Sequence, residues 1–359
     1  MYGRLNREVK IYREIYPLRI LDLGGWTDTW FSKYGNVCNI SVLTRLFGSS
    51  SGPFRGIDII ISQKQSMLSK IVINAMDLNF DLTISLEELR KDVFDHQNLL
   101  ASTLSQVWTG SLSHFETEIL IMSPVEPGAS MGTSATVSGG LLDLLEKMRY
   151  KEKDKVDKKF IVKKAFSVEK TVMRRQTGTQ DYFSAVFGLG AQKIIVTDYP
   201  NTDIEKINLS LKTKEKLEAG LVTVFIGRHD SSDTHLMVIK RMEEDENNLN
   251  DLEPLRQCAV RGADALANND LIKYGECLSE NTNYQKRLHP DLVGDKFESI
   301  IDLAVAINRP LGYKVNGAGG AGGTISILFN SREHAENFVS VARKELNENY
   351  IYYEHQLTC

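Results

Sequence analysis

The sequence predicts an α+β protein with two domains. Strand-like runs and helical patterns are mixed along the chain without the regular strand–helix–strand rhythm of a parallel sheet. The chain has 359 residues, enough for two domains, and 42% of them are hydrophobic, enough for a core. Asp, Pro and Asn cluster at Tyr199–Asp203. This cluster predicts a boundary between a domain of residues 1–200 and a domain of residues 201–359.

Each element is predicted from hydrophobic spacing or β-forming composition. The first half predicts strands and then a helix, at Val9–Tyr12, Arg19–Leu23, Cys38–Leu43, Gly56–Ser62, Lys70–Val72 and Leu86–Thr109. It continues with a strand at Glu118–Met122 and helices through Val137–Met148 and Ile161–Val172. The second half predicts a strand at Val222–Gly227 and an acidic loop at Glu243–Asp251. Three helices are then predicted, at Leu255–Ala267, Leu271–Thr282 and Phe297–Asn308. Two strands, at Gly312–Val315 and Thr324–Phe329, and a helix at Arg332–Asn347 complete the prediction.

Bulk composition argues against several classes of protein. The formal net charge is −4, without the basic excess of a nucleic-acid-binding protein. Residues 147–164 hold nine Lys or Arg, but no aromatic platform accompanies them, which favours a solvated surface. Four widely spaced cysteines suggest neither a disulfide framework nor a metal site. With no apolar run for a signal peptide or a membrane span, we expect a cytoplasmic protein that does not bind membranes.

The most informative segment is residues 124–136, which read Pro-Val-Glu-Pro-Gly-Ala-Ser-Met-Gly-Thr-Ser-Ala-Thr before a helical pattern. Gly128 and Gly132 permit a tight curl, and the helix start offers free N–H groups at the positive end of its dipole. Such a loop is a ready phosphate site, and Thr133 and Ser134 add hydroxyls for phosphate or a metal ion. The alternative is an ordinary capped helix. The loop is not a Walker A loop, because no Lys follows Gly132.

A second glycine-rich segment, residues 314–323, reads Lys-Val-Asn-Gly-Ala-Gly-Gly-Ala-Gly-Gly. It contains a literal G-x-G-x-x-G, but a strand follows it instead of the helix that a dinucleotide fold requires. The pattern predicts strand, glycine turn, strand. A flexible hairpin is the alternative. The segment has more glycine than a hairpin needs. We therefore expect its backbone to pass very close to a ligand or to a second loop.

Two further segments carry polar constellations. After a predicted strand, Gly24 and Gly25 present Trp26, Thr27 and Asp28, an aromatic, a hydroxyl and a carboxylate that suit a polyol. A polar turn would use the same residues. Downstream, Glu169 borders a helical stripe and Asp181 follows a turn containing glycine. Isolated acidic residues like these are usually solvated, so neither alone indicates a site.

Taken together and in this order, these segments resemble the GHMP kinase family of galactokinases, homoserine kinases, mevalonate kinases and phosphomevalonate kinases. The family motif Pro-x-Gly-x-Gly-Leu-Gly-Ser-Ser-Ala resembles Pro127–Ala135, with Ser130 in place of Gly and Met131 in place of Leu. The glycine run at Gly317–Gly323 resembles its C-terminal motif, with Ala321 intruding. The segment from Arg19 to Asp28 is most similar to heptose-phosphate kinases and fucokinases, although Thr29-Trp30 replaces their Pro-Pro.

The resemblance implies a two-domain fold with an N-terminal ribosomal-S5-like half and a C-terminal ferredoxin-like half. It also implies ATP and Mg²⁺ as cofactors and a role for each motif residue. Asp181 and Arg19 would be catalytic. Ser134 and Glu169 would hold the metal. The substrate-binding residues would be Trp26, Thr27, Asp28, Asn39, Arg228 and Ser231. The nucleotide-binding residues would be Pro127, Gly128, Ala129, Ser130, Met131, Gly132, Thr133, Ser134, Gly317, Gly319 and Gly320.

The function so implied is ATP-dependent phosphorylation of a sugar or sugar phosphate, at the anomeric hydroxyl of a heptose-7-phosphate-like or fucose-like acceptor. Alternatives from other classes stay open. One is a kinase of a non-sugar alcohol such as mevalonate or homoserine. Another is a catalytically inactive sensor that binds sugar and ATP, and a third is a plain interaction protein. The sequence does not indicate an oligomeric state.

Overall fold

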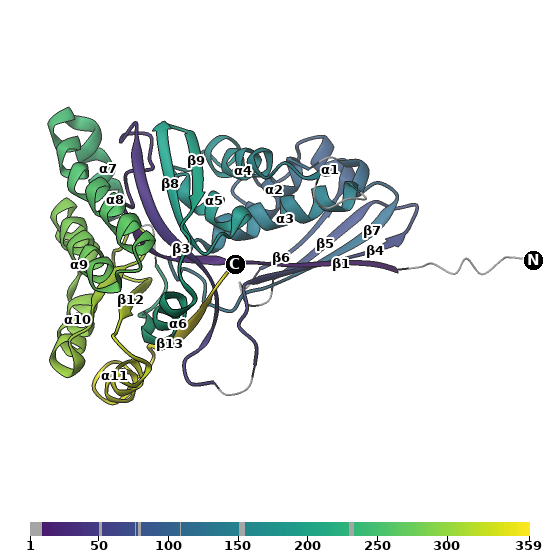
Figure 1. Cartoon of the computed structure of the whole chain (residues 1–359). Helices are drawn as coiled ribbons and strands as arrows, with labels where there is room; N and C mark the ends of the chain where they lie inside the picture. The colour runs from purple at the N-terminus through teal and green to yellow at the C-terminus, as the bar shows by residue number, and fades with distance from the viewer. Residues whose placement is uncertain are drawn as a thin grey trace, which may run out of the picture. The chain divides into compact units, whose positions relative to one another are not determined.

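The computed structural model describes residues 9–49, 52–75, 77, 80–107, 109–150, 155–229 and 233–359. It is an α+β structure with two β-sheets, as the sequence predicts (Figure 1). Its contacts divide the chain into two compact units. Unit 1 comprises Met1–Tyr16, Gly56–Pro124 and Ser134–Thr177, and unit 2 comprises Pro17–Arg55, Val125–Thr133 and Gly178–Cys359.

Unit 1 is built on a five-stranded sheet in the order β1-β4-β7-β5-β6. Its strands are β1 (Val9–Tyr16), β4 (Ile57–Gln65), β5 (Lys70–Ala75), β6 (Phe80–Ser85) and β7 (Phe115–Met122). Only the β5–β7 pair is parallel. Helices cover one face of this sheet (Figure 1). They are α1 (Leu86–Arg90), α2 (Leu99–Ser105), the 3₁₀ turn Thr109–Ser111, α3 (Thr133–Arg149), α4 (Lys158–Ser167) and the π-helix η4 (Val168–Val172).

Unit 2 contains an antiparallel sheet in the order β11-β12-β10-β13-β3-β8-β9, with β2 also paired to β3. Its strands are β2 (Leu18–Leu23), β3 (Gly35–Leu46), β8 (Ala191–Asp198), β9 (Asn201–Lys206), β10 (Leu221–Phe225), β11 (Gly312–Val315), β12 (Thr324–Leu328) and β13 (Ile351–Leu357). Its helices are α5 (Gln180–Phe187), α6 (Leu211–Gly220), α7 (Asp233–Glu244), the 3₁₀ helix Glu246–Leu252, α8 (Glu253–Ala267), α9 (Leu271–Leu288), the 3₁₀ turn Pro290–Val293, α10 (Asp295–Asn308) and α11 (Arg332–Glu345).

The two compact units divide the chain differently from the boundary that we predicted near residue 200. The stretch Tyr199–Asp203 forms the turn between β8 and β9 and the start of β9. Turn composition marks the end of a strand, but it does not tell which sheet the strand joins. Here β3 pairs with both β8 and β13, so early and late segments share one sheet. The division into domains of residues 1–200 and 201–359 stays a prediction.

Some element predictions were wrong. The helix predicted over Leu86–Thr109 is two short helices, α1 and α2, because Ser85 and Asn98 each cap a separate start. The acidic loop contains the 3₁₀ helix Glu246–Leu252. Seven further elements were not predicted from the sequence, namely β6, β8, β9, β13, α5, α6 and α7. The strand–glycine turn–strand prediction is confirmed, since β11 and β12 pair antiparallel around residues 316–323.

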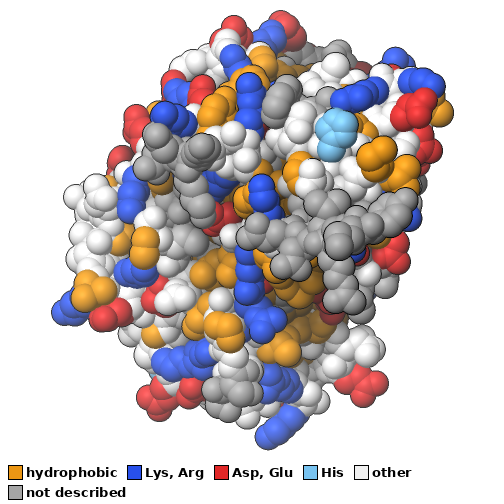
Figure 2. Space-filling model, turned by 90° about the vertical axis from the view of Figure 1, so that its right-hand side faces the viewer, with side chains coloured by type: hydrophobic (Ala, Val, Ile, Leu, Met, Phe, Trp, Pro, Cys, Tyr) orange, Lys and Arg blue, Asp and Glu red, His pale blue; other side chains and the backbone are white. Residues whose placement is uncertain are grey.

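One face of the molecule illustrates how its basic side chains are placed. On the face shown in Figure 2, Lys and Arg side chains lie among hydrophobic and acidic ones. Within the basic run, Lys147 pairs with Asp143 at 2.8 Å and Arg149 with Glu146 at 3.5 Å, so these charges are partly neutralised inside unit 1. Over the ranges that the structure describes, no helix is both long and apolar enough to cross a membrane.

Candidate active site

The site begins at an irregularity in β2. Ile20 pairs with Ile40 and Leu23 with Cys38, so β2 carries one more residue than β3 between these pairs, which is a β-bulge. At the bulge Leu21 has a positive φ of 56°, and its N–H donates to Oδ1 of Asn316 at 2.9 Å. In a regular strand, residues three apart point to opposite faces. The extra residue instead brings Arg19 and Asp22 into an ion pair at 3.5 Å.

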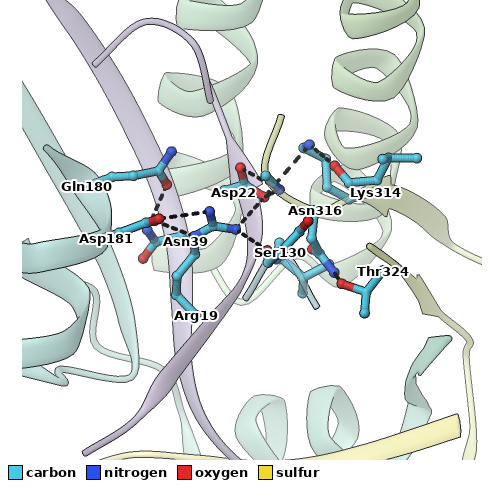
Figure 3. A network of polar contacts seen from close by, with 12 residues as sticks. Arg19, Asp22, Asn39, Ser130, Gln180, Asp181, Lys314, Asn316 and Thr324 are labelled. Carbon is cyan, nitrogen blue, oxygen red and sulfur yellow. Dashed lines mark hydrogen bonds and ion pairs between the residues drawn. The ribbon is translucent and has the colours of Figure 1, made fainter. Parts of the chain in front are cut away.

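Arg19 forms an ion pair with Asp181, which lies in the first turn of α5 (Figure 3). Nε donates to Oδ1 at 2.6 Å and Nη2 to Oδ2 at 3.2 Å, the bidentate geometry in which Arg–carboxylate pairs are strongest. The guanidinium is buried, whereas the Asp181 side chain is 30% exposed. Burial alone lowers the pKa of Arg19, but Asp181 and Asp22 outweigh it and raise that pKa above its usual value. The arrangement holds a permanent positive charge beside an accessible carboxylate.

The predicted phosphate loop is held by its carbonyl groups. His229 N–H donates to the Gly128 carbonyl at 2.9 Å, and Thr324 Oγ1 donates to that of Ala129 at 2.8 Å. Arg19 binds the next two carbonyl groups. Its Nη1 donates to the Ser130 carbonyl at 2.9 Å, and its backbone N–H donates to the Met131 carbonyl at 3.0 Å. In a trans peptide the next N–H points away from the carbonyl. Each carbonyl group of residues 128–131 is bound by a donor. The N–H of the next residue, in 129–132, therefore points away from that donor.

The same loop alternates in backbone conformation. Gly128, Ser130 and Gly132 have φ values of 76°, 58° and 74°, while the residues between them keep negative φ. Positive φ at every second residue curls the chain tightly, as the sequence predicted for Gly128 and Gly132, and curled loops of this kind can bind anions through their N–H groups. Helix α3 starts immediately afterwards at Thr133, whose buried hydroxyl has no hydrogen-bond partner among the described residues. The backbone geometry thus fits a phosphate group.

The glycine-rich segment packs against two other loops. A Cβ on Gly322 would lie 2.2 Å from the carbonyl oxygen of Arg228, and one on Gly323 would lie 2.5 Å from Ser130 Oγ. The close approach to a second loop that the sequence predicted is therefore confirmed. Gly317 and Gly323 together leave room for the Ser130 side chain, which stands where the family motif has Gly. Direct contact of Gly317, Gly319 and Gly320 with nucleotide stays a prediction.

Asp28 is almost fully buried and contacts the N-terminus of α5, the helix that carries Asp181. Its Oδ2 accepts the Gln180 N–H at 2.9 Å, and its carbonyl accepts the Thr179 N–H at 3.2 Å. Burial raises the pKa of the Asp28 carboxyl to about 6, against the lowering effect of the Gln180 hydrogen bond. Gly178 is required here, since a Cβ would lie 2.2 Å from Asp28 Oδ2. Asp28 thus holds the N-terminus of α5, and sugar binding by Asp28 stays a prediction.

The other predicted substrate residues differ in accessibility. Trp26 is 9% exposed and packs edge-on to His235 with ring centroids 5.5 Å apart, while its Nε1 has no hydrogen-bond partner among the described residues. Thr27 donates to the Gly24 carbonyl inside the turn at 2.7 Å. Asn39 is buried. Its Nδ2 donates to Gln180 and Ser184, and its Oδ1 accepts from Gln192. Arg228 is exposed, and Ser231 lies outside the described residues. Substrate contact by each of these residues stays a prediction.

The two predicted metal ligands meet in unit 1. Ser134 Oγ at the start of α3 donates to Glu169 Oε1 in the π-helix η4 at 2.9 Å, across 35 positions of sequence. In the described part of the chain, no group of three or more His, Cys, Asp or Glu side chains could hold a metal. A hydroxyl and a carboxylate suit Mg²⁺, which prefers oxygen ligands and usually keeps several waters and substrate phosphates. The pair fits that ion, and its role stays a prediction.

Sequence reasoning missed four buried residues of this network. Asp22, Lys314, Asn316 and Thr324 are all at most 1% exposed. Asn316 donates to Thr324 and Ser326, and Gly317 N–H donates to both carboxylate oxygens of Asp22 at 3.0 and 3.1 Å. Charged residues inside predicted strands are the one signal that could have found Asp22 and Lys314.

No family model matches the sequence, and no curated protein matches it. Solved structures match its fold over almost the whole chain. A D-glycero-D-manno-heptose 1-phosphate kinase from Bacteriodes thetaiotaomicron has a TM-score of 0.69 at 17% identity, covering 97% of this chain and 96% of that chain. Mevalonate kinase from Methanococcus jannaschii has a TM-score of 0.70 at 16% identity, covering 99% and 100%. Galactokinase from Lactococcus lactis, complexed with galactose, has a TM-score of 0.68 at 16% identity, covering 97% and 94%.

The chain has the GHMP kinase fold. The fold predicted from the glycine-rich segments and the Arg19–Asp28 segment is therefore confirmed. Kinases of sugars and of mevalonate match it about equally well. The GHMP kinase fold is thus shared across acceptor classes, and the choice of acceptor has to be argued from side chains.

Proposed function

We propose that this protein is an ATP- and Mg²⁺-dependent kinase that phosphorylates the anomeric hydroxyl of a sugar or sugar phosphate. The observation that carries the proposal is the position of Arg19. One guanidinium binds Asp181 through Nε and Nη2 and the carbonyl of Ser130 in the phosphate loop through Nη1. It therefore ties the carboxylate that would receive a hydroxyl proton to the loop that would receive the nucleotide phosphates.

The reaction asks little covalent chemistry of the protein. The acceptor oxygen forms a bond to the γ-phosphorus, the bond from that phosphorus to the bridging β,γ-oxygen breaks, and ADP leaves with the electron pair. Asp181 accepts or orients the hydroxyl proton. Each carboxylate oxygen has lone pairs beyond those that Arg19 uses. A loose transition state, in which charge neutralisation and in-line placement matter most, asks mainly that Asp181 orient the hydroxyl.

The phosphate loop and the start of α3 supply the remaining electrostatics. The N–H groups of residues 129–132 would cradle the nucleotide phosphates. Ser134 and Glu169 would hold Mg²⁺, which when bound neutralises charge on the β- and γ-oxygens. The two side chains already lie together, joined by a 2.9 Å hydrogen bond.

A sugar acceptor is favoured by residues near Asp181. Asp28 is a buried carboxylate that accepts the Gln180 N–H at the N-terminus of α5, and carboxylates bind vicinal hydroxyls that homoserine does not have. The Trp26 Nε1, in the same unit, has no acceptor within the described part of the chain. The resemblance of Arg19–Asp28 to heptose-phosphate kinases and fucokinases adds the anomeric position. The four cysteines are free thiols, which fits our proposal of a cytoplasmic enzyme.

The deciding experiment is ATP consumption with Mg²⁺ against free hexoses, heptoses and deoxyhexoses, their terminal phosphates, mevalonate and homoserine. Phosphorus NMR of the product then locates the new phosphate by its coupling to carbon. The matched control is Asp181→Asn, which keeps the shape of the side chain and removes its charge. We expect a sugar 1-phosphate from the wild type and at least about 100-fold slower turnover from the variant.

Other outcomes contradict specific parts of the proposal. Mevalonate or homoserine as the best acceptor would reject the sugar. Nucleotide and sugar binding without turnover would identify a sensor, and no nucleotide binding at all would favour an interaction protein. Near wild-type turnover by Asp181→Asn would remove this residue from the mechanism.

A further inference from the structure

The feature that the mechanism leaves unused is a buried acid–base pair behind Arg19. Asp22 is fully buried on the bulged strand β2, and Lys314 on β11 is 1% exposed. Charged side chains are almost never fully buried unless they are paired. Nζ of Lys314 lies 3.8 Å from Oδ1 of Asp22, at the end of the network in Figure 3.

The surroundings of Lys314 fit a charged ammonium. Its Nζ donates to Gln285 Oε1 at 2.9 Å and to the carbonyl of Val315, and Asp22 is its third neighbour. Two hydrogen-bond acceptors and one nearby carboxylate suit the three N–H donors and the charge of an ammonium. Burial lowers the pKa of Lys314, and Asp22 opposes that change. The Lys314 side chain thus lies beside Asp22 in the protein interior, away from solvent.

Asp22 itself joins two parts of the site. Its two oxygens accept the Gly317 N–H at the start of the glycine-rich segment, at 3.0 and 3.1 Å. On its other side Oδ1 lies 3.5 Å from Nη1 of Arg19. The bulge at Leu21 is what turns Asp22 toward Arg19, and the φ of 56° there is unfavourable for a Leu. Strain of this kind persists where the surroundings over-determine it and often marks a functional site.

We propose that Asp22, paired with Lys314, is a positioning residue that couples the glycine-rich segment to the catalytic Arg19–Asp181 pair. Arg19 shares its charge between Asp22 and Asp181, so the carboxylate of Asp22 fixes the plane of the guanidinium. The same carboxylate fixes Gly317, so the segment and the guanidinium keep one arrangement. The kinetic consequence rests on the proposed function, whereas the positioning itself does not.

Positioning predicts a local change that can be measured without substrate. In protein labelled with ¹⁵N-arginine, the Nε–H of Arg19 is identified as the signal that Asp181→Asn displaces most. We expect Asp22→Asn and Lys314→Met each to shift or broaden this signal. The matched control is Glu354→Gln, which removes another buried carboxylate of unit 2, paired with Arg45 at 2.8 Å. It should leave the Arg19 signal in place.

The kinetic arm separates positioning from stability. If Asp22 acts through Arg19, Asp22→Asn lowers kcat by about 10- to 100-fold, the range expected for small misplacement of catalytic groups, while both KM values stay within about threefold. The double variant Asp22→Asn/Lys314→Met should regain melting temperature, because it removes the unpaired buried charge, while its kcat stays low, because the carboxylate that positions Arg19 is still missing. Glu354→Gln should lower the melting temperature without lowering kcat.

Each result has one meaning. An unmoved Arg19 signal, or a kcat that falls no further than in Glu354→Gln, overturns the coupling. If Asp22→Asn does not fold, Lys314→Met carries the same two expectations. If the wild type phosphorylates no alcohol, the proposed function fails, and the arginine signal alone still decides the positioning role.

Discussion

Arg19 Nε lies 2.6 Å from Asp181 Oδ1, a contact between β2 and α5 that spans 162 positions of sequence. The strand supplies a rigid base, and the first turn of α5 supplies a helix N-terminus that favours the carboxylate anion. Because Arg19 also holds the carbonyl of Ser130, one side chain sets the distance between the carboxylate and the phosphate loop. Tests of the proposed function should therefore begin at this residue.

Arg19→Lys should reduce kcat by about 10²- to 10³-fold, similar to the loss of one well-placed electrostatic donor. Lysine keeps the charge, but its single ammonium cannot bind Asp181 through two atoms while also holding the Ser130 carbonyl. Steady-state kinetics on the best acceptor measure the change, and circular dichroism checks the fold. The control is Arg45→Lys, at an arginine whose carboxylate partner is Glu354. Equal kcat for the Arg19 variant and the control would show that bidentate pairing is not needed.

Glu169→Gln and Ser134→Ala should each raise the Mg²⁺ concentration needed for half-maximal activity. Both changes remove a hard oxygen ligand from the pair that meets at 2.9 Å, and Mg²⁺ tolerates such losses poorly. The measurement is a magnesium titration at saturating ATP and acceptor. Glu146→Gln on α3 is the control, since Glu146 pairs instead with Arg149. Unchanged titration curves for both variants would contradict the metal assignment.

The sequence predicted the fold and both ends of the main ion pair, but not what lies between them. Arg19 and Asp181 stand in recognisable motifs, and the Ser134–Glu169 contact was expected from the same resemblance. Asp22 could not be placed, because at regular strand spacing it would point away from Arg19. The bulge depends on a positive φ at Leu21. Leucine rarely adopts a positive φ, so the presence of Leu at this position does not predict the bulge.

Burial was the second quantity that the sequence could not supply. Asn39 and Thr27 are polar and fall in motif positions, yet both are fully buried. Their partners come from Gln180, Gln192 and the Gly24 turn, which only the folded chain brings near. Polar residues in a strand-end loop are compatible with ligand binding and with internal hydrogen bonding alike.

Asp28→Asn should stabilise the protein above pH 6. Burial raises the pKa of Asp28 to about 6, above the ordinary value of about 4 for an unfolded chain. Between these values the folded state holds the proton more tightly, so stability falls as pH rises, and above pH 6 the full cost is present. A difference of about two units corresponds to about 3 kcal/mol. Asparagine cannot ionise and keeps an oxygen to accept the Gln180 N–H.

Urea unfolding at pH 4 and at pH 7.5 measures this effect. We expect the variant to be more stable by about 1–3 kcal/mol at pH 7.5, with the gap closing at pH 4. Asp203→Asn, at an exposed site on β9, is the control and should show no such pattern. If Asp28 also binds the sugar, the same variant raises the KM for the acceptor and leaves that for ATP unchanged. A variant less stable than the wild type at pH 7.5 would contradict the burial argument.

Ser130→Gly should raise the free energy of unfolding by about 1 kcal/mol. A left-handed φ of 58° costs a residue other than glycine about 1–2 kcal/mol. The buried Ser130 Oγ also has no hydrogen-bond partner among the described residues, which adds a desolvation cost. Against this, glycine gains about 0.4–1 kcal/mol of freedom in the unfolded chain. Lys33→Gly is the control, since Lys33 has a φ of 64° at an exposed site. If Ser130→Gly raises the free energy of unfolding no more than Lys33→Gly does, the buried Ser130 hydroxyl does not contribute to the effect.

A double-mutant cycle then tests whether Ser130 and Gly323 are matched to each other. An added Cβ at Gly323 would lie 2.5 Å from Ser130 Oγ, so Gly323→Ala should clash with this hydroxyl as well as strain a φ of 101°. The strain is present in either background and cancels in the cycle, whereas the clash disappears when residue 130 is Gly. We therefore expect Gly323→Ala to cost at least about 1 kcal/mol less in the Ser130→Gly protein. Additive effects would mean that the two loops do not depend on each other, and the serine would then be accommodated by movement of its own loop.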